Sequence, residues 1–151
     1  MNAIIENLLT RRSTRAFLQK EIPDNELNEI LQAAIYAPSG MGKQTWKFTV
    51  LCNQEKIQQL AELIGRKLGR KGYDMYRPQV LIIPSNQKEN PHGMEDNACA
   101  LENIFLAAHS FGIGSVWINQ LRTLCDDPEV RALLDEFEIP SYEEWKEAVV
   151  A

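Results

Sequence analysis

The stretch of residues 94–119 constrains the fold of this chain more than any other part of the sequence. Residues 95–111 predict a helix, because two carboxylates in the first turn complement its positive end and Gly112 suits its C-terminal cap. Apolar side chains occupy almost every side of this helix, which indicates a buried element. Residues 113–118 then predict a buried strand that contains a glycine, a position where a ligand or another backbone often comes close.

Length and composition favour one globular unit. A chain of 151 residues predicts a single domain, residues 1–151, that buries most of its apolar surface. With 44% hydrophobic and 25% charged residues, wholesale disorder is excluded. A formal net charge of −5 argues against a general nucleic-acid binder. No apolar run approaches the roughly 20 residues needed to cross a bilayer, and the first residues lack a signal-peptide pattern.

The cysteines give a further indication of the cellular compartment. Cys52, Cys99 and Cys125 are odd in number and share no metal-binding or redox spacing. We therefore expect buried thiols in a reducing cytoplasm. Together with the composition, this predicts a soluble cytoplasmic protein with no membrane partner and no nucleic-acid partner.

Hydrophobic periodicity predicts the remaining elements. Helices are expected over about residues 2–10, 24–37 and 57–68 and from Asp127 onward, and strands over 46–52 and 80–83. The basic, glycine-spaced residues 65–72 are expected to fray the third helix. Beyond Pro140 the pattern weakens to one helical turn at 142–146 and the start of a strand at 148–151. Because strands and helices are interspersed without strict alternation, the sequence predicts an α+β fold arranged as a three-layer sandwich.

Residues 11–15, with the sequence Arg-Arg-Ser-Thr-Arg, follow the first predicted helix and have two interpretations. In the first, which is the more frequent for a basic triplet, the arginines offset the negative end of the helix and lie in solvent. In the second, the guanidinium groups and a nearby hydroxyl bind a phosphate group. The residues by themselves leave both interpretations open.

Several familiar chemical sites are excluded. The Gly-Lys-Gln-Thr sequence is not a nucleotide-binding P-loop, because Ala37 stands where the motif needs glycine and Gln44 stands where it needs serine or threonine. His92 and His109 lack carboxylate or cysteine partners at ligand spacing, so no metal site is expected. No nucleophile elbow or catalytic triad pattern is present. The residues therefore indicate anion binding rather than acid–base chemistry.

Three separated segments do carry a resemblance to a known family. Residues 11–17, 37–46 and 97–117 occur in the order and spacing typical of the FMN-dependent nitroreductase family, which the chain resembles over about residues 2–140. The resemblance implies a three-layer α-β-α sandwich around a mostly antiparallel sheet and a long buried central helix. It also implies a homodimer with two FMN sites in the subunit interface.

The resemblance assigns ten cofactor-binding residues to three groups. The motif that holds the flavin phosphate and ribityl chain corresponds to Arg11, Arg12, Ser13 and Arg15. The loop that reaches the flavin from the other subunit corresponds to Pro38, Ser39, Gly40 and Gln44. The segment whose backbone lies along the isoalloxazine ring, near its N5 edge, corresponds to Gly114 and Ser115.

The resemblance also implies an activity. NAD(P)H gives a hydride to flavin N5 and leaves, and an electron-poor acceptor such as a nitroaromatic or a quinone then takes its place, with no side chain acting as an obligatory acid or base. Two alternatives stay open: a flavin-binding or sensing protein with little turnover, and a structural helical dimer without flavin. Family members usually continue beyond the match to residues 139–140 into another strand and a basic tail, so we expect a C-terminus shortened relative to the family.

Overall fold

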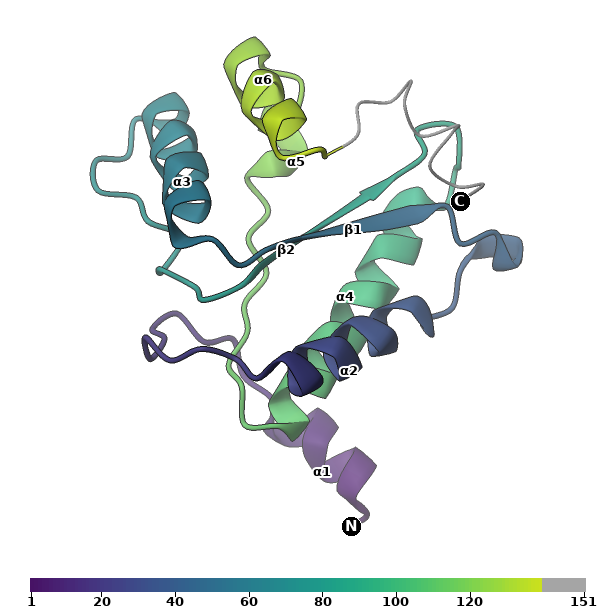
Figure 1. Ribbon diagram of the computed structural model, residues 1–151. Helices are drawn as coiled ribbons and strands as arrows, with labels where there is room; N and C mark the ends of the chain where they lie inside the picture. The colour runs from purple at the N-terminus through teal and green to yellow at the C-terminus, as the bar shows by residue number, and fades with distance from the viewer. Residues whose placement is uncertain (140–151) are drawn as a thin grey trace.

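The computed structural model describes residues 1–139, and a pair of strands forms the middle layer of that range (Figure 1). Strand β1 (Trp46–Leu51) pairs antiparallel with β2 (Leu81–Asn86), so that the first residue of each strand lies opposite the last residue of the other. The predicted strand at 46–52 is confirmed. The second strand continues through Pro84, because within residues 1–139 each strand pairs on one edge only, and a missing N–H on the other edge breaks no ladder.

Helices cover both faces of this sheet, as Figure 1 shows. One layer contains α2 (Asp24–Ile35) and α4 (Gly93–Ser110), and the other contains α3 (Gln54–Leu68) and α6 (Pro128–Glu136). The three-layer α-β-α arrangement predicted from the sequence is therefore confirmed. The described range also contains α1 (Ala3–Thr10), the short α5 (Leu121–Leu124) and a 3-10 helix η1 (Gly40–Gly42).

Two hydrophobic clusters hold the layers together. Successive strand side chains point to opposite faces, so Leu51 and Ile83 pack toward α3 and α6 while Trp46 and Ile82 pack toward α2 and α4. The first cluster is centred on fully buried side chains of two helices: Ile57, Leu60, Ile64 and Val130. The second joins the inner faces of α2 and α4 through Ile30, Ala34, Ala100, Ile104, Phe105 and Ala108.

Helix α4 occupies the central position that the sequence predicts. One face is buried against α2 and the sheet, and the small side chains of Ala100 and Ala108 allow the close packing of α2. The helix ends where it was expected to end, because Gly112 adopts a left-handed φ of +74° and donates its N–H to the carbonyl of His109. Within residues 1–139 no helix is both long and apolar enough to span a membrane.

The predicted strand over residues 113–118 is wrong. This segment runs from the end of α4 to α5 on the other side of the sheet (Figure 1), and its only bridge among the described residues is a parallel one between Ser115 and Ser13. A strand needs a continuous neighbour, and β1 and β2 pair with each other instead. Trp117, expected to be buried, is 50% exposed.

The expected fraying of the third helix is also wrong. Helix α3 does not fray at residues 65–72: it continues through the buried Gly65 to Leu68 and ends at Gly69, whose φ is +66°. Glycine is accommodated at position 65 because a Cβ there would lie 2.8 Å from the Cβ of Tyr73, where the following loop packs back on the helix.

The cysteines are not the buried thiols that their spacing suggested. Cys52 and Cys99 are exposed and Cys125 is partly exposed. Cys52 follows the end of β1, and Cys99 lies on the outer side of α4, where the apolar helix has no covering element within the described chain. The helical turn and strand expected at 142–146 and 148–151 lie outside the described residues.

Candidate functional site

Two of the three predicted site segments lie side by side although most of the chain separates them in sequence. The N–H of Thr14 donates to the carbonyl oxygen of Ser115 at 2.9 Å, and Ser13 forms the parallel bridge with Ser115. The contact requires a glycine next to it, because a Cβ on Gly114 would lie 2.8 Å from three atoms of the Thr14 side chain. The close approach predicted at Gly114 is thus made by the segment that carries the arginines.

The arginines of residues 11–15 have different partners. The Arg12 guanidinium donates to the carbonyl oxygens of Leu9 at 2.9 Å and Arg11 at 2.8 Å, so it caps the end of α1. The Nε of Arg11 lies 3.9 Å from a carboxylate oxygen of Glu102. Arg15 is exposed and forms no hydrogen bond or ion pair with residues 1–139. The helix-end interpretation therefore holds for Arg12, and the phosphate interpretation stays a prediction for Arg15.

A histidine anchors the start of this segment. The hydroxyl of Thr10 donates to the carbonyl oxygen of Glu6 at 2.8 Å, so its oxygen must accept from Nε2 of His109, also at 2.8 Å. Nε2 of the imidazole is therefore the donor in this bond. The bond holds the end of α1 against the last turn of α4.

The third predicted segment, residues 38–44, is built around a different set of contacts. The N–H of Gly40 donates to Oδ1 of Asp96 at 2.8 Å. Within the loop, the N–H of Gln44 donates to Oγ of Ser39 at 3.2 Å, and its side-chain amide donates to the carbonyl oxygen of Ile35 at 3.3 Å. These bonds fold the loop back on the end of α2, and the exposed Pro38 begins it.

The same loop contains backbone strain. Met41 and Gln44 adopt left-handed φ values of 57° and 48°, which residues other than glycine rarely adopt. Such conformations persist only where surrounding contacts hold them, and they concentrate at functional segments. The Met41 side chain is almost fully exposed, so the strain is not explained by core packing.

The structure does not bring all ten predicted residues together within one chain. Residues 11–15 and 114–115 lie near the C-terminal end of α4, whereas residues 38–44 lie beside its first turn. Asp96, which bonds to Gly40, and His109, which bonds to Thr10, are 13 residues apart on α4, or about 20 Å at about 1.5 Å per residue, whereas Arg11 reaches Glu102 in the middle of the helix.

Sequence reasoning missed the residues that hold the loop. Asp96 was interpreted only as a carboxylate at the positive end of a helix, yet it is 4% exposed and bonds directly to Gly40. Thr45, also buried, links to Asn90 and Asn86. A buried polar side chain cannot be recognised from local spacing here, because its partners lie 41 to 56 positions away.

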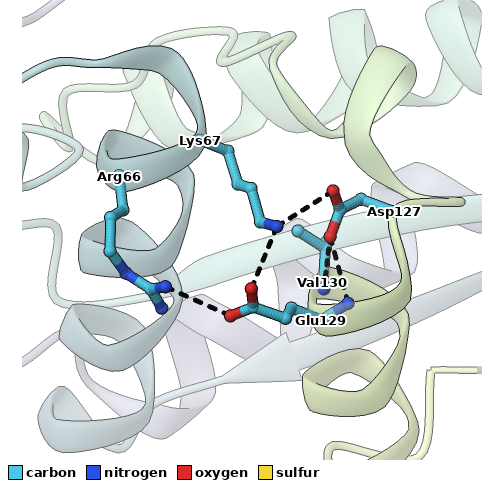
Figure 2. A network of polar contacts seen from close by, with 5 residues as sticks. All are labelled: Arg66, Lys67, Asp127, Glu129 and Val130. Atoms are coloured by element: carbon cyan, nitrogen blue, oxygen red, sulfur yellow. Dashed lines mark hydrogen bonds and ion pairs between the residues drawn. The ribbon is translucent and has the colours of Figure 1, made fainter.

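The strongest charge cluster lies away from these segments, between α3 and α6 (Figure 2). Nζ of Lys67 is 3.1 Å from a carboxylate oxygen of Asp127 and 3.1 Å from one of Glu129, and Arg66 also pairs with Glu129 at 3.2 Å. The hydrogen bonds to Asp127 and Glu129 raise the pKa of Lys67, and the bond from Lys67 lowers the pKa of Glu129. Arg66 and Lys67 therefore form ion pairs that link α3 to the start of α6.

Solved structures resemble the whole described fold. A nitroreductase with bound FMN from Bacteroides fragilis is 45% identical with a TM-score of 0.89, over 93% of this chain and 82% of that one. An FMN-dependent nitroreductase from Clostridium difficile is 33% identical with a TM-score of 0.77, over 91% of this chain and 80% of that one.

Sequence comparison agrees with this similarity. A relative from Methanothermobacter thermautotrophicus, whose name includes NAD(P)H nitroreductase, is 32% identical over 115 residues, which are 76% of this chain and 59% of the relative. An NADPH-flavin oxidoreductase from Vibrio harveyi is 29% identical over 81% of this chain and 55% of that protein. The chain thus spans less than two thirds of both relatives. The sequence profile of the Nitroreductase family matches residues 8–151, and the chain belongs to the nitroreductase family.

Proposed function

We propose that this protein is an FMN-dependent oxidoreductase that takes a hydride from NAD(P)H and passes it to an electron-poor acceptor such as a nitroaromatic or a quinone. Its similarity to a nitroreductase with bound FMN and to an NADPH-flavin oxidoreductase supports the proposal. When bound, FMN supplies a ring atom that takes up and releases hydride, which no protein side chain can do. The protein supplies binding, orientation and electrostatics.

The observation that carries the proposal is the contact between residues 11–15 and 114–115. It places Ser13 and the segment that carries Arg15, whose guanidinium has no partner within residues 1–139, beside an exposed backbone at Gly114. Within residues 1–139 the Gly114 N–H donates to no protein acceptor. A cationic, hydroxyl-bearing segment next to open backbone N–H suits a ligand that combines a phosphate with a flat polar ring.

The roles of the individual residues follow from their contacts. Arg15 is the principal phosphate anchor, with Ser13 beside it. Arg12 contributes by fixing the end of α1, and Arg11 keeps a long contact with Glu102 that leaves its remaining guanidinium donors available. Gly114 and Ser115 present backbone to the flavin ring, and no side chain is assigned as an acid or base.

Completion of the site requires a second copy of the chain. Gly40 bonds to Asp96 in the first turn of α4, whereas Thr14 bonds to Ser115 beyond the other end of that helix, so we assign Pro38, Ser39, Gly40 and Gln44 to the flavin held by the partner subunit. Exposed apolar side chains on α1, including Ile4 and Leu9, support a homodimer with FMN in its interface. We further propose that residues 1–151 form one domain and that the protein is cytoplasmic, in keeping with three free thiols.

An FMN titration of the purified protein, followed by absorbance and flavin fluorescence, tests the proposal. We expect Arg15→Ala to raise the FMN dissociation constant at least about tenfold, because a charged hydrogen bond contributes roughly 1.5–3 kcal/mol. Arg122→Ala, an exposed arginine on α5, is the matched control and should leave affinity unchanged. Equal affinities of the Arg15→Ala variant and the unmodified protein would contradict the phosphate assignment.

The same preparation separates the alternatives. Protein that binds FMN and oxidises NADH or NADPH with a nitroaromatic or quinone acceptor supports the proposed activity. Protein that is yellow but oxidises neither nucleotide would instead be a flavin-binding or sensing protein. A colourless protein whose melting temperature does not change when FMN is added would be a structural dimer, because a ligand that binds only the folded state must stabilise it.

A further inference from the structure

We propose that Asp96 is a positioning residue that holds the Pro38–Gln44 loop in the shape required to contact the FMN of the partner subunit. The inference rests on the proposed function and adds a residue outside the predicted site. Asp96 acts through the backbone of Gly40, and so it would influence a flavin that it does not touch.

Asp96 is a buried carboxylate that is hydrogen-bonded to the loop. Its side chain is 4% exposed, Oδ1 accepts the Gly40 N–H at 2.8 Å, and Oδ2 lies 3.4 Å from the side-chain amide nitrogen of Asn90. Its position in the first turn of α4 places the carboxylate at the positive end of the helix. Burying a carboxylate is costly unless its oxygens are bonded, so the bond to Gly40 is needed by both partners.

The far end of the loop is tied to the same place. The Thr45 hydroxyl donates to Oδ1 of Asn86 at 2.6 Å and accepts from the amide of Asn90 at 2.7 Å. Asn86 in turn donates to Oδ1 of Asn97 at 3.0 Å. Asn90 thus joins the Asp96 carboxylate to Thr45, and one polar network fixes the loop at both Gly40 and Thr45.

What lies between these two anchors is the strained part of the loop. Met41 and Gln44 hold left-handed conformations there. Gly40 packs closely against His92, because a Cβ at position 40 would lie 2.7 Å from the His92 ring. Without the bond from Gly40 to Asp96, the strained residues can relax to common backbone conformations while both hydrophobic clusters stay intact.

We expect Asp96 to affect FMN binding at the partner subunit's site, because Asp96 and the loop lie at one end of α4. Asp96 lies in the first turn of α4, whereas Thr10 bonds to His109 in its last turn and Thr14 bonds to Ser115 beyond its end. The loop that Asp96 holds is therefore at the opposite end of α4 from the contact between Thr14 and Ser115.

Two substitutions distinguish positioning from bulk stability. Asp96→Ala removes the acceptor for Gly40, and we expect the FMN dissociation constant to rise at least tenfold and the visible flavin bands to shift toward those of free FMN. Asp96→Asn keeps an acceptor oxygen in place and should stay within about threefold of the unmodified protein. If Asp96→Ala does not fold, Asp96→Ser, which is too short to reach Gly40, replaces it. Folded variants with unchanged affinity and spectrum would overturn the proposal.

A mixed dimer tests the action across the interface. One subunit carries Asp96→Ala and the other Arg15→Ala, each purified through a different affinity tag. The Asp96→Ala subunit still provides its arginines and the Arg15→Ala subunit still provides its loop, so one of the two sites is intact and half of the sites should bind FMN with normal affinity. If no site regains normal affinity, Asp96 does not act across the interface and the proposal is overturned.

The failure of this inference is distinguishable from failure of the proposed function. Unmodified protein that does not bind FMN would remove the proposed function, and this inference with it. Unmodified protein that binds FMN, together with an Asp96→Ala variant that binds it equally well, would overturn only the role of Asp96.

Discussion

At the scale of single residues, the site depends on the absence of a side chain at one position. Gly114 lies where the basic segment meets the segment after α4, and any Cβ there would come within 2.8 Å of Thr14. Its φ does not lie in the left-handed region, so the requirement is for space and not for an unusual backbone conformation. The glycine therefore sets how closely residues 11–15 approach residues 114–115.

We expect Gly114→Ala to destabilise the protein by about 1–3 kcal/mol, because an added methyl in a closely packed contact forces the neighbours apart. Urea denaturation measures the loss. Thr14→Gly removes all three clashing atoms, so the double variant should lose less than the sum of the single variants.

Gly72→Ala is the matched control for this prediction. It has a left-handed φ of +69° but nothing near its Cβ, so it should show only the backbone cost of roughly 1 kcal/mol and no coupling to Thr14. Additive losses for Gly114→Ala and Thr14→Gly would contradict the steric explanation.

At the scale of elements, the contact between α3 and α6 combines an apolar core with a charge network at its edge (Figure 2). Asp127 has two roles, since one oxygen accepts the N–H groups of Glu129 and Val130 at the start of α6 and the other pairs with Lys67. Burial acts to raise the pKa of Asp127, but the bond from Lys67 and these backbone bonds together lower it. Asp127 therefore caps the start of α6 and, through its ion pair with Lys67, links α6 to α3.

The network should stabilise the protein over a defined range of pH. The lowered pKa values of Asp127 and Glu129 mean that their contribution is present above their ordinary values of 3.8 and 4.5 and is lost as pH falls through the folded values. The raised pKa of Lys67 means that its contribution is present below 10.5 and is lost as pH rises through the folded value. Stabilisation is therefore complete between about pH 4.5 and 10.5.

We expect Lys67→Met, which keeps the apolar stem, to lower the melting temperature at pH 7 and to have a smaller effect near pH 2.5, below the ordinary carboxylate pKa values of 3.8 and 4.5. Thermal unfolding at both pH values measures this. Lys71→Met removes an exposed lysine that makes no ion pair within residues 1–139, and it should change neither value. An equal loss at both pH values would show that packing, not charge, explains the effect.

At the scale of the whole molecule, α1 exposes apolar side chains that the rest of the described chain does not cover. It has no buried residue, and Ile4 and Leu9 are 73% and 60% exposed. Its hydrogen bonds to α4, through Asn7 to the carbonyl of Leu106 and through Thr10 to His109, hold it in place without covering its apolar side chains. An amphipathic helix left uncovered is typical of an element that packs against a partner.

We expect Leu9→Glu to weaken the proposed homodimer at least about tenfold, because burial of one leucine side chain contributes roughly 1.5–3 kcal/mol. Sedimentation velocity over a range of protein concentrations measures the dissociation constant. Gln59→Glu adds the same charge to an exposed position of α3 and serves as the control. A Leu9→Glu protein that dimerises as tightly as the control would exclude α1 from the interface.

The sequence by itself determined most of the elements and their ends. The cap at Gly112, the Asp127-Pro128 start of α6 and the alternation in β1 are all recognisable because the interactions that decide them join residues within a few positions. The three-layer arrangement also follows, since the apolar faces of such elements can be buried in few ways. The three site segments were recognisable as motifs of a family.

Only the tertiary structure decided how those segments are used. Within residues 1–139 it separated the helix-capping Arg12 from Arg15, which has no partner there, and replaced the predicted strand at 113–118 by one bridge to Ser13. It also joined Asp96 to Gly40 across 56 positions. The physical reason is that these outcomes depend on which distant backbone groups packing brings within hydrogen-bond distance. Local spacing carries no information about such partners, whereas the packing of α1, α2 and the loops around α4 specifies them.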